Sequence, residues 1–91
     1  MKIESFVWND KNIEHIGNHD VSPDEAEEIF VSKYFLLKTR QGRYMAFGKT
    51  FAGRYLIVVF EFLEGARGIQ VITARDMNEK EKKLYRRKLK L

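Results

Sequence analysis

The stretch that decides the fold is Tyr55-Leu56-Ile57-Val58-Val59-Phe60, in which every side chain is apolar. A strand that is apolar at every position predicts burial on both faces, so we place it in the centre of a sheet. Aromatic and β-branched residues dominate three successive segments: Tyr34–Thr39, Arg43–Thr50 and Arg54–Phe62. The turn pairs Gln41-Gly42 and Ala52-Gly53 separate them, so the three segments predict an antiparallel meander.

A fourth strand is expected after this meander. The turn Glu64–Gly68 leads into an apolar run that ends at Arg75. Asn78 then predicts the start of a C-terminal helix, because it can cap the helix while Glu81, three residues on, completes a capping box. This helix is dense in lysine and arginine. A guanidinium on a rigid strand end is thus placed beside a field of positive charge, which suits it to grip and polarise a phosphate.

Two helices are expected before the sheet. A short apolar strand at residues 6–8 precedes Asn9, which can cap a helix over Asp10–Gly17. Ser22-Pro23-Asp24-Glu25 is a capping box with proline at the first helical position, and it predicts a second helix that continues to about Phe30. The expected fold is therefore α+β: two N-terminal helices, a curled antiparallel sheet of four strands and a basic C-terminal helix.

Length and composition narrow the class of protein. The 91 residues predict a single domain over 1–91. The absence of cysteine excludes a disulfide framework and a zinc site built on thiolates, and it suits a reducing cytoplasm. No apolar run approaches the roughly 18 residues of a membrane-spanning helix, and the N-terminus lacks a signal-peptide pattern. We therefore expect a cytoplasmic protein with no membrane contact.

Charge is unevenly distributed along the chain, although the net charge is only +4. Between Asn9 and Phe30 there are seven carboxylates and one base, Lys11, whereas from Val31 to Leu91 fifteen lysines and arginines outnumber five acids. Such segregation predicts one surface that suits a polyanion and one that does not. For the C-terminal run alone, the alternative is a solvated helix face.

In their order and spacing, the residues resemble the BrnT-type toxins of bacterial toxin–antitoxin systems. The resemblance covers nearly the whole chain and rests on these positions together: Trp8, Lys11, His19-Asp20-Val21-Ser22, Glu25-Ala26, Arg43, Phe47-Gly48, Ile72-Thr73-Ala74-Arg75, Glu81 and Tyr85. It implies a RelE-like fold of the RelE/ParE-like superfamily, action on RNA, and silencing by a BrnA-like ribbon-helix-helix antitoxin. Asp20 departs from the pattern, since the family usually has glycine there, but aspartate tolerates a left-handed backbone.

Cleavage of RNA without a metal ion needs a deprotonated 2′-hydroxyl, a neutralised phosphorane and a protonated leaving 5′-oxygen. Arg75 and Arg43 suit the second task, because a guanidinium offers paired donors and keeps its charge. His19 suits proton transfer, with Glu81 as an alternative base or as its orienting partner. We expect these four residues to be catalytic. His15 and His19 lack a third nearby ligand, so we expect no metal ion and no cofactor.

The expected RNA-binding residues are bases and one aromatic: Lys11, Lys49, Arg54, Tyr85 and Arg86. Tyr85 follows Glu81 by one helical turn, so it would share that helix face and donate to a phosphate or stack on a base. Lys11 has an alternative role, which is to balance the acidic N-terminal segment.

The other candidates also have structural explanations. His19 can simply close the first helix, and Glu81 can serve only the capping box. Tyr85 can be a core aromatic with its hydroxyl at the rim. The two catalytic arginines can pair with the acids Glu61 or Asp76. Only an observed convergence of the side chains would favour catalysis.

Two functions from different classes follow. As an enzyme, the protein cleaves mRNA in a basic cleft between the sheet and the last helix, and thereby inhibits translation. As a non-catalytic RelE/ParE-like binding module or an inactive toxin remnant, it acts through protein contacts. The resemblance further implies a heterotetramer with the antitoxin, which alone contacts the operator DNA. Occlusion of the basic cleft by an acidic antitoxin segment is the expected mode of inhibition.

Overall fold

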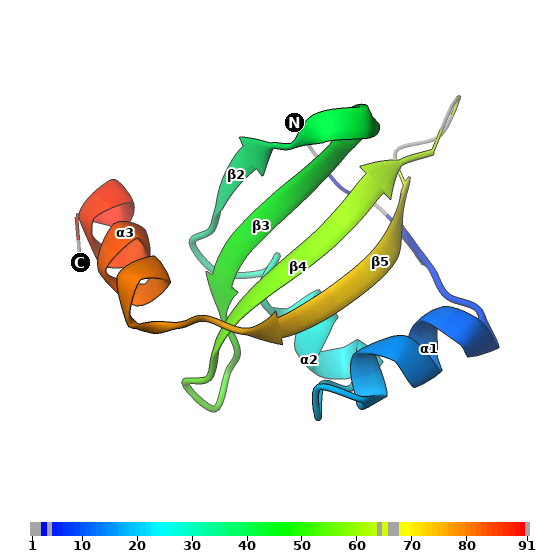
Figure 1. Ribbon diagram of the computed structural model, residues 1–91, viewed down its shortest axis with the longest axis horizontal. Helices are drawn as coiled ribbons and strands as arrows, with labels where there is room; N and C mark the ends of the chain where they lie inside the picture. The colour runs from blue at the N-terminus through cyan, green and yellow to red at the C-terminus, as the bar shows by residue number, and fades with distance from the viewer. Residues whose placement is uncertain (1–2, 4, 64, 66–67, 91) are drawn as a thin grey trace.

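The structure is a computed structural model that describes residues 3, 5–63, 65 and 68–90. Its elements in chain order are β1 (Ser5–Val7), α1 (Asp10–Gly17), α2 (Pro23–Glu28), β2 (Phe35–Lys38), the 3₁₀ turn η1 (Arg40–Gly42), β3 (Arg43–Lys49), β4 (Tyr55–Phe62), β5 (Gly68–Asp76) and α3 (Glu79–Leu89). The strands form one sheet in the order β1-β5-β4-β3-β2 (Figure 1). β1 runs parallel to β5, and all other neighbours are antiparallel.

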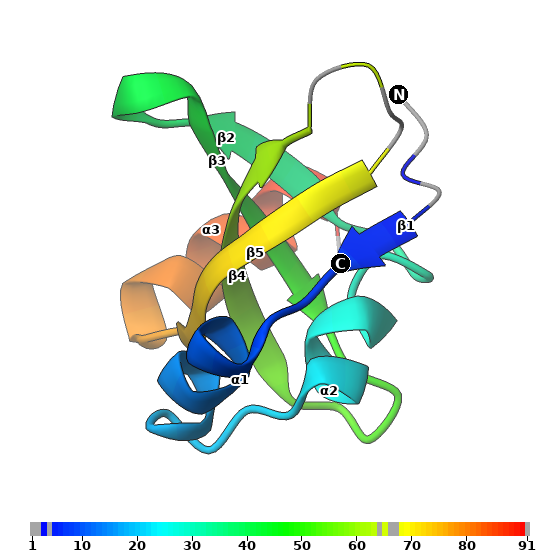
Figure 2. The same ribbon diagram turned by 90° about the vertical axis from the view of Figure 1, so that its right-hand side faces the viewer.

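The sheet has a fifth strand that the expected four-stranded sheet lacks. The four antiparallel strands are present, but β1 also joins the sheet beside β5 (Figure 2). Ser5 pairs with Gly68, so the two partners are far apart in sequence and no turn signal connects them. The short entry strand expected at residues 6–8 is present as Ser5–Val7, but a strand of three residues gives no signal of its partner in the sheet. The expectation of a wholly antiparallel sheet of four strands was therefore wrong. Part of the predicted Glu64–Gly68 turn lies outside the described residues.

The predicted helix starts are all present. The Asn9 side chain accepts from the Asn12 N–H at 2.8 Å, and capping boxes join Ser22 to Glu25 and Asn78 to Glu81. α2 ends at Glu28 rather than near Phe30, because the chain tightens into 3₁₀-type bonds, in which the Phe30 N–H donates three residues back. Such local bonds depend on neighbours in sequence, which is why the helix starts were predictable.

β4 is buried on both faces, as its apolar run predicts. Leu56, Val58 and Phe60 belong to a core beneath α1 and α2. Ile57 belongs to a second core on the other face, with Phe47, Met77 and Tyr85. The helices α1 and α2 therefore cover one face of the sheet, and α3 packs on the opposite face at one end (Figures 1 and 2).

A β-bulge in β5 decides which way Arg75 points. Val59 pairs with Thr73 but Phe60 pairs with Val71, so Ile72 is the extra residue on β5. Because side chains alternate between faces, this extra residue moves Arg75 to the face that carries α3, opposite Ile57. In a regular strand, Arg75 would share the face of Val71, beneath α1 and α2. The Asn12 side-chain amide donates to the Val71 carbonyl at 2.7 Å beside the bulge.

We predict that Gly48→Ala destabilises the fold. A Cβ on Gly48 would lie 2.6 Å from the Ile29 Cβ and 3.1 Å from its carbonyl oxygen, and Ile29 is fully buried. We expect the free energy of unfolding in urea to fall by about 1–3 kcal/mol, as for other overpacked sites. Gly17→Ala is the matched control, because it has open space at the end of α1 and should gain roughly 0.5–1 kcal/mol. Equal stability of the two variants would contradict this close contact.

Candidate functional site

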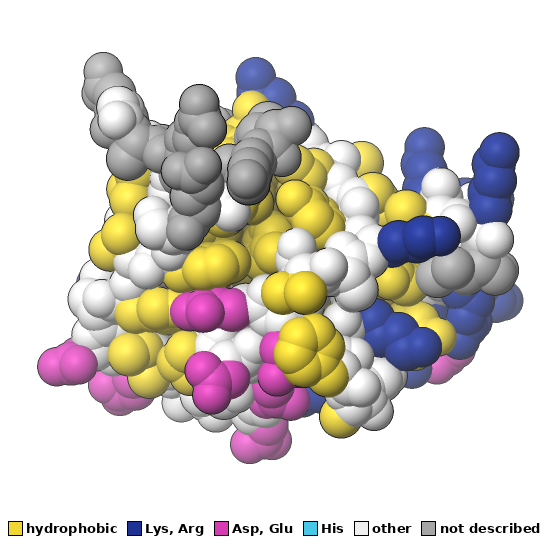
Figure 3. Space-filling view, turned by 180° about the vertical axis from the view of Figure 1, so that it is seen from behind, with side chains coloured by type: hydrophobic (Ala, Val, Ile, Leu, Met, Phe, Trp, Pro, Cys, Tyr) yellow, Lys and Arg dark blue, Asp and Glu magenta, His cyan; other side chains and the backbone are white. Residues whose placement is uncertain are grey.

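Positive charge gathers at the α3 end of the sheet. The last turn of α3 carries Arg86, Arg87 and Lys88. Seen from the α1–α2 side, acidic side chains lie along the lower part of the molecule, and lysines and arginines lie at the α3 end (Figure 3). The predicted separation of charge is therefore present in three dimensions, and the α3 end suits a polyanion better than the acidic side that carries α1 and α2.

Arg75 and Glu81 form the best-defined polar pair at that end. Nη1 and Nη2 of Arg75 each donate to a Glu81 carboxylate oxygen at 2.8 Å, which is a bidentate geometry. Glu81 also accepts from the Asn78 N–H at 2.8 Å as part of the capping box. The Arg75 side chain remains 42% exposed. Glu81 thus holds Arg75 in a fixed orientation while the guanidinium stays accessible.

This pair also fixes the charge of both groups. The Arg75 hydrogen bonds are the main cause that lowers the pKa of Glu81; burial opposes the shift, and the Asn78 bond adds to it. The Glu81 carboxylate in turn raises the pKa of Arg75. A carboxylate with a lowered pKa is a weak base, so its position suits orientation of Arg75 better than proton transfer.

Arg54 ties the α1–α2 loop to the end of β5. Its Nε and Nη2 donate to the Asp76 carboxylate at 2.7 and 3.0 Å, and Nη1 donates to Glu25 at 3.2 Å. Nη1 and Nη2 also donate to the carbonyls of Asp20 and His19. The Asp76 bonds are the main cause that raises the pKa of Arg54. All five N–H groups are engaged, so Arg54, expected to bind RNA, has no donor left for a phosphate in this arrangement.

The structure does not bring His19, Lys11 and Arg75 together. His19 is exposed after α1, and its ring centroid lies 6.1 Å from that of His15. Its carbonyl reaches Asp76 only through the Arg54 guanidinium. Asp20, which follows it, has φ +58°, the left-handed conformation expected where the family has glycine. Lys11 is exposed on α1, which covers the sheet face opposite to α3.

Arg43 shares the sheet face of Arg75 but lies farther along the strands. Arg75 pairs with Ile57, which pairs with Phe47, whereas Arg43 pairs with Glu61. Arg43 is four residues from Phe47 on β3, a displacement of about 13 Å along the strand. The two arginines therefore lie at different positions along the same sheet face.

Tyr85 is part of the second core. It is 2% exposed, and its ring centroid lies 5.7 Å from that of Tyr55 in an edge-on contact. Its hydroxyl donates to the Lys33 carbonyl at 3.0 Å, and burial raises the pKa of Tyr85. These contacts match the structural explanation of a core aromatic, and they leave no open ring face for a base.

Three cations surround Tyr55, which was not among the expected site residues. The Nζ atoms of Lys49 and Lys82 lie 5.4 and 5.7 Å from the ring centroid, and the Cζ of Arg86 lies 5.3 Å from it. Tyr55 begins the apolar run of β4, so its pattern indicates only a core residue. Two spacings in the sequence could have identified this cluster. Lys49 pairs with Tyr55 across the predicted hairpin, and Lys82 and Arg86 are one helical turn apart.

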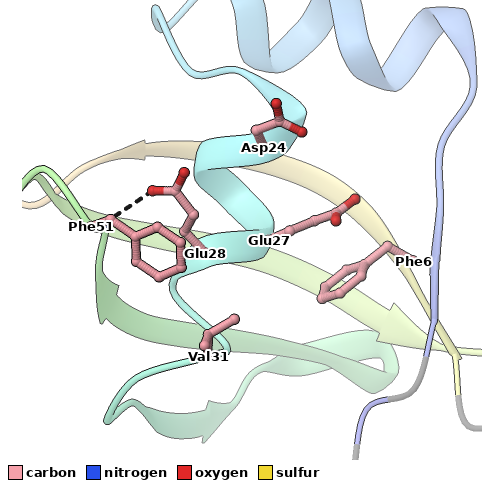
Figure 4. A pocket seen from close by; sticks show the side chains of 6 residues that line it. All are labelled: Phe6, Asp24, Glu27, Glu28, Val31 and Phe51. Atoms are coloured by element: carbon pink, nitrogen blue, oxygen red, sulfur yellow. Dashed lines mark hydrogen bonds between the residues drawn. The ribbon is translucent and has the colours of Figure 1, made fainter.

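The hollow beside α2 is acidic. It has a volume of about 320 Å³ and is lined by Phe6, Asp24, Glu27, Glu28, Val31 and Phe51 (Figure 4). Glu27 accepts from the Trp8 indole N–H at 2.8 Å, and Glu28 accepts from the Phe51 backbone N–H at 3.0 Å. Three carboxylates repel phosphates, so this hollow does not suit a polyanion.

Within the described part of the chain, no group of three or more histidine, cysteine, aspartate or glutamate side chains is arranged to hold a metal ion. Among the same residues, no helix has the length and apolar character needed to cross a membrane.

Comparisons with known proteins give a family and a fold. The family described as "Ribonuclease toxin, BrnT, of type II toxin-antitoxin system" matches residues 8–81. The crystal structure of the Brucella abortus ribonuclease toxin BrnT is similar to this chain with a TM-score of 0.68 and 23% sequence identity. That likeness covers 82% of this chain and 97% of the Brucella chain, and at this identity it shows the fold alone. A search of curated proteins found no match.

We predict that the Arg54 contacts make stability sensitive to acid. The Arg54 bonds are the main cause that lowers the pKa of Asp76; for Glu25 the main cause is the Ser22 N–H, with Arg54 adding to it. Because both pKa values are lower in the folded state, the stabilisation is present above about pH 5 and is lost as the pH falls through the folded values. The urea midpoint of the wild type should therefore fall steeply below about pH 5.

Arg54→Ala should lower the free energy of unfolding at pH 7 by about 1–2 kcal/mol, a value discounted for partial exposure. It should also flatten the acid dependence, because the carboxylates lose their partner. Arg87→Ala, which removes an exposed arginine of α3, is the matched control and should change neither quantity. A pH dependence in Arg54→Ala as steep as that of the wild type would contradict this explanation.

Proposed function

Because the chain belongs to the BrnT family of ribonuclease toxins of type II toxin–antitoxin systems, we propose that it is an endoribonuclease that cleaves mRNA without a metal ion and thereby inhibits translation. The observation that carries this proposal is the Arg75 guanidinium, which is fixed at a strand end, partly exposed and close to the basic helix α3. A guanidinium in this position offers paired donors to a phosphate and keeps its charge throughout the reaction.

In the proposed reaction, Arg75 stabilises the negative charge that develops on the pentavalent phosphorane. Glu81 keeps the guanidinium oriented through its two hydrogen bonds, so we assign it a positioning role. We retain His19 as the candidate for proton transfer from the 2′-hydroxyl or to the leaving oxygen, because its side chain is exposed and histidine is the residue most often used in this role. Arg43 would bind a neighbouring nucleotide, since it lies farther along the same face.

The RNA-binding surface that we propose is narrower than the expected one. Lys49 and Arg86 remain in it, because both lie at the α3 end of the molecule. Three expected RNA-binding residues are left out for the reasons already given: Lys11, Arg54 and Tyr85. Lys11 lies on the other side of the sheet, Arg54 has all its donors engaged, and Tyr85 is buried.

A toxin of a type II system acts with an antitoxin. We propose that its partner is a BrnA-like ribbon-helix-helix protein, that the two form a heterotetramer in the cytoplasm, and that only the antitoxin contacts operator DNA. Attraction between opposite charges would guide an acidic segment of the antitoxin to the α3 end. Such a segment would occlude Arg75 and so inhibit cleavage.

A second candidate function is a non-catalytic binding module, and exposed apolar side chains favour it. Phe51 is 71% exposed and Val31 is 74% exposed, and both line the acidic hollow beside α2. Scattered exposed apolar residues are common in proteins, so this observation weighs less than the family and Arg75.

We predict that the purified protein cleaves a long RNA in the presence of EDTA and that Arg75→Ala loses about 10²–10³-fold in rate, the usual loss for a donor that stabilises a developing charge. Circular dichroism would establish that the variant folds. Retained cleavage in His19→Ala would reduce His19 to a residue that closes a helix. No cleavage by the wild type, even with ribosomes supplied, would favour the binding module.

Glu81→Gln separates orientation from general base catalysis. Glutamine can still complete the capping box with Asn78, but it cannot form the ion pair with Arg75 or accept a proton at neutral pH. If Glu81 only orients Arg75, the rate should fall less than about tenfold, because a neutral hydrogen bond keeps part of that orientation. A loss as large as that of Arg75→Ala, measured in the same RNA assay, would identify Glu81 as the base.

A further inference from the structure

The cations around Tyr55 lead to an inference that rests on the proposed function and deepens it. We propose that Lys49, Tyr55, Lys82 and Arg86 form a phosphate-binding subsite, which holds the RNA backbone beside the phosphate at Arg75. We call these four residues the Tyr55 subsite.

Rigid elements bring the four side chains together. Lys49 ends β3 and Tyr55 begins β4, and the two are paired across the hairpin. Lys82 and Arg86 lie one turn apart on α3, which packs on the same face of the sheet through Tyr85. All three cationic groups lie between 5.3 and 5.7 Å from the Tyr55 ring centroid. Such a geometry is pre-organised, so a ligand would not need to order it.

The charge of the Tyr55 subsite is less neutralised than that of the nearby arginines. Arg54 and Arg75 are bound to carboxylates at 2.7–2.8 Å. In the part of the chain that the structure describes, the only carboxylate within 4.0 Å of the subsite cations is Glu79, at 3.4 Å from Lys82 with its side chain 81% exposed. A single exposed ion pair of this kind is weak, and a phosphate can replace it at low cost.

Cation–π attraction to one ring offsets only part of the repulsion among three positive groups. An anion bound between them would relieve the remainder. A phosphodiester suits the position better than a carboxylate, because its oxygens can accept from several separated donors while the Tyr55 hydroxyl donates to one of them. Hydrogen bonding with Arg86 is the main cause that lowers the pKa of Tyr55, and the charges of Arg86, Lys49 and Lys82 act in the same direction. The three cations thus make the electrostatic potential at the hydroxyl positive, which attracts an anion.

The Tyr55 subsite adjoins Arg75. Tyr55 lies two residues before Ile57 on β4, and Ile57 is the cross-strand partner of Arg75. The Met77 N–H donates to the Tyr55 carbonyl at 3.0 Å, which continues the same pairing. Tyr55 and Arg75 are therefore diagonal neighbours on one sheet face, a relation that separates residues by about 7–8 Å. One RNA strand can contact both.

The test measures binding separately from cleavage. A fluorescent oligonucleotide with 2′-O-methyl groups lacks the attacking hydroxyl, so its dissociation constant can be measured by anisotropy from about 50 to 200 mM salt. For single strands, each lost phosphate contact should reduce the slope of log K against log salt by about 0.7. We expect this change, with about fivefold weaker binding at 0.1 M salt, in Lys49→Ala and in Lys82→Ala. Tyr55→Phe should weaken binding without changing the slope, because the hydroxyl is neutral.

Lys83→Ala is the matched control, because Lys83 is exposed on the same helix and is not among the cations near the Tyr55 ring. Its slope should stay within experimental error of the wild type, and Lys49→Arg should restore wild-type binding because it keeps the charge. Thermal unfolding of each variant distinguishes lost contacts from lost folding. Unchanged affinity and slope in both lysine variants would overturn the Tyr55 subsite, and so would an equal effect in Lys83→Ala.

Two further outcomes keep this proposal distinct from the proposed function. A wild type that binds the oligonucleotide through the Tyr55 subsite but never cleaves unmodified RNA would leave the subsite standing and refute the ribonuclease. If cleavage depends on Arg75 but the lysine variants bind the oligonucleotide as the wild type does, the ribonuclease stands and the Tyr55 subsite is refuted. Binding of poly-glutamate that depends on Lys49 and Lys82 as strongly as RNA binding does would show a site for acidic protein and overturn the phosphate assignment.

Discussion

The burial of β4 on both faces is the constraint on which the rest of the structure depends. Its side chains point alternately to the two faces of the sheet, so an apolar layer must pack on each face. Helices α1 and α2 pack on one face, and α3 packs on the other. Because α3 packs only at one end, the sheet face beside it stays partly open. The groups that we propose to bind phosphates, Arg75 and the Tyr55 subsite, lie at that end.

Local chemistry explains what could be predicted from the sequence. Helix starts depend on bonds between residues three apart, so Asn9, Ser22 and Asn78 identified them correctly. Strand periodicity likewise identified the meander. The pairing of β1 with β5, the bulge at Ile72 and the contacts of Arg54 were not predictable, because each depends on residues distant in sequence. The family resemblance selected Arg75 and Glu81, but it could not indicate that they bind each other.

The distribution of ion pairs separates two kinds of basic residue in this protein. Arg54 is a structural residue, whose donors are consumed in joining the α1–α2 loop to β5. Lys49 and Arg86 have no such role among the described contacts. Contacts from such residues to a phosphate backbone supply affinity and orientation, but they carry no sequence information. If RNA sequence is read at all, base edges must be contacted by other groups.

The β-bulge has a consequence for how the chain reaches its native pairing. A β5 strand paired without the extra residue would place the Arg75 guanidinium under α1 and α2, where an unpaired charge costs several kcal/mol. That alternative pairing is penalised before any ligand is present. The residue that we propose to act on RNA therefore also helps the folding chain to reject a mispaired sheet, and its replacement by an apolar side chain would remove this discrimination.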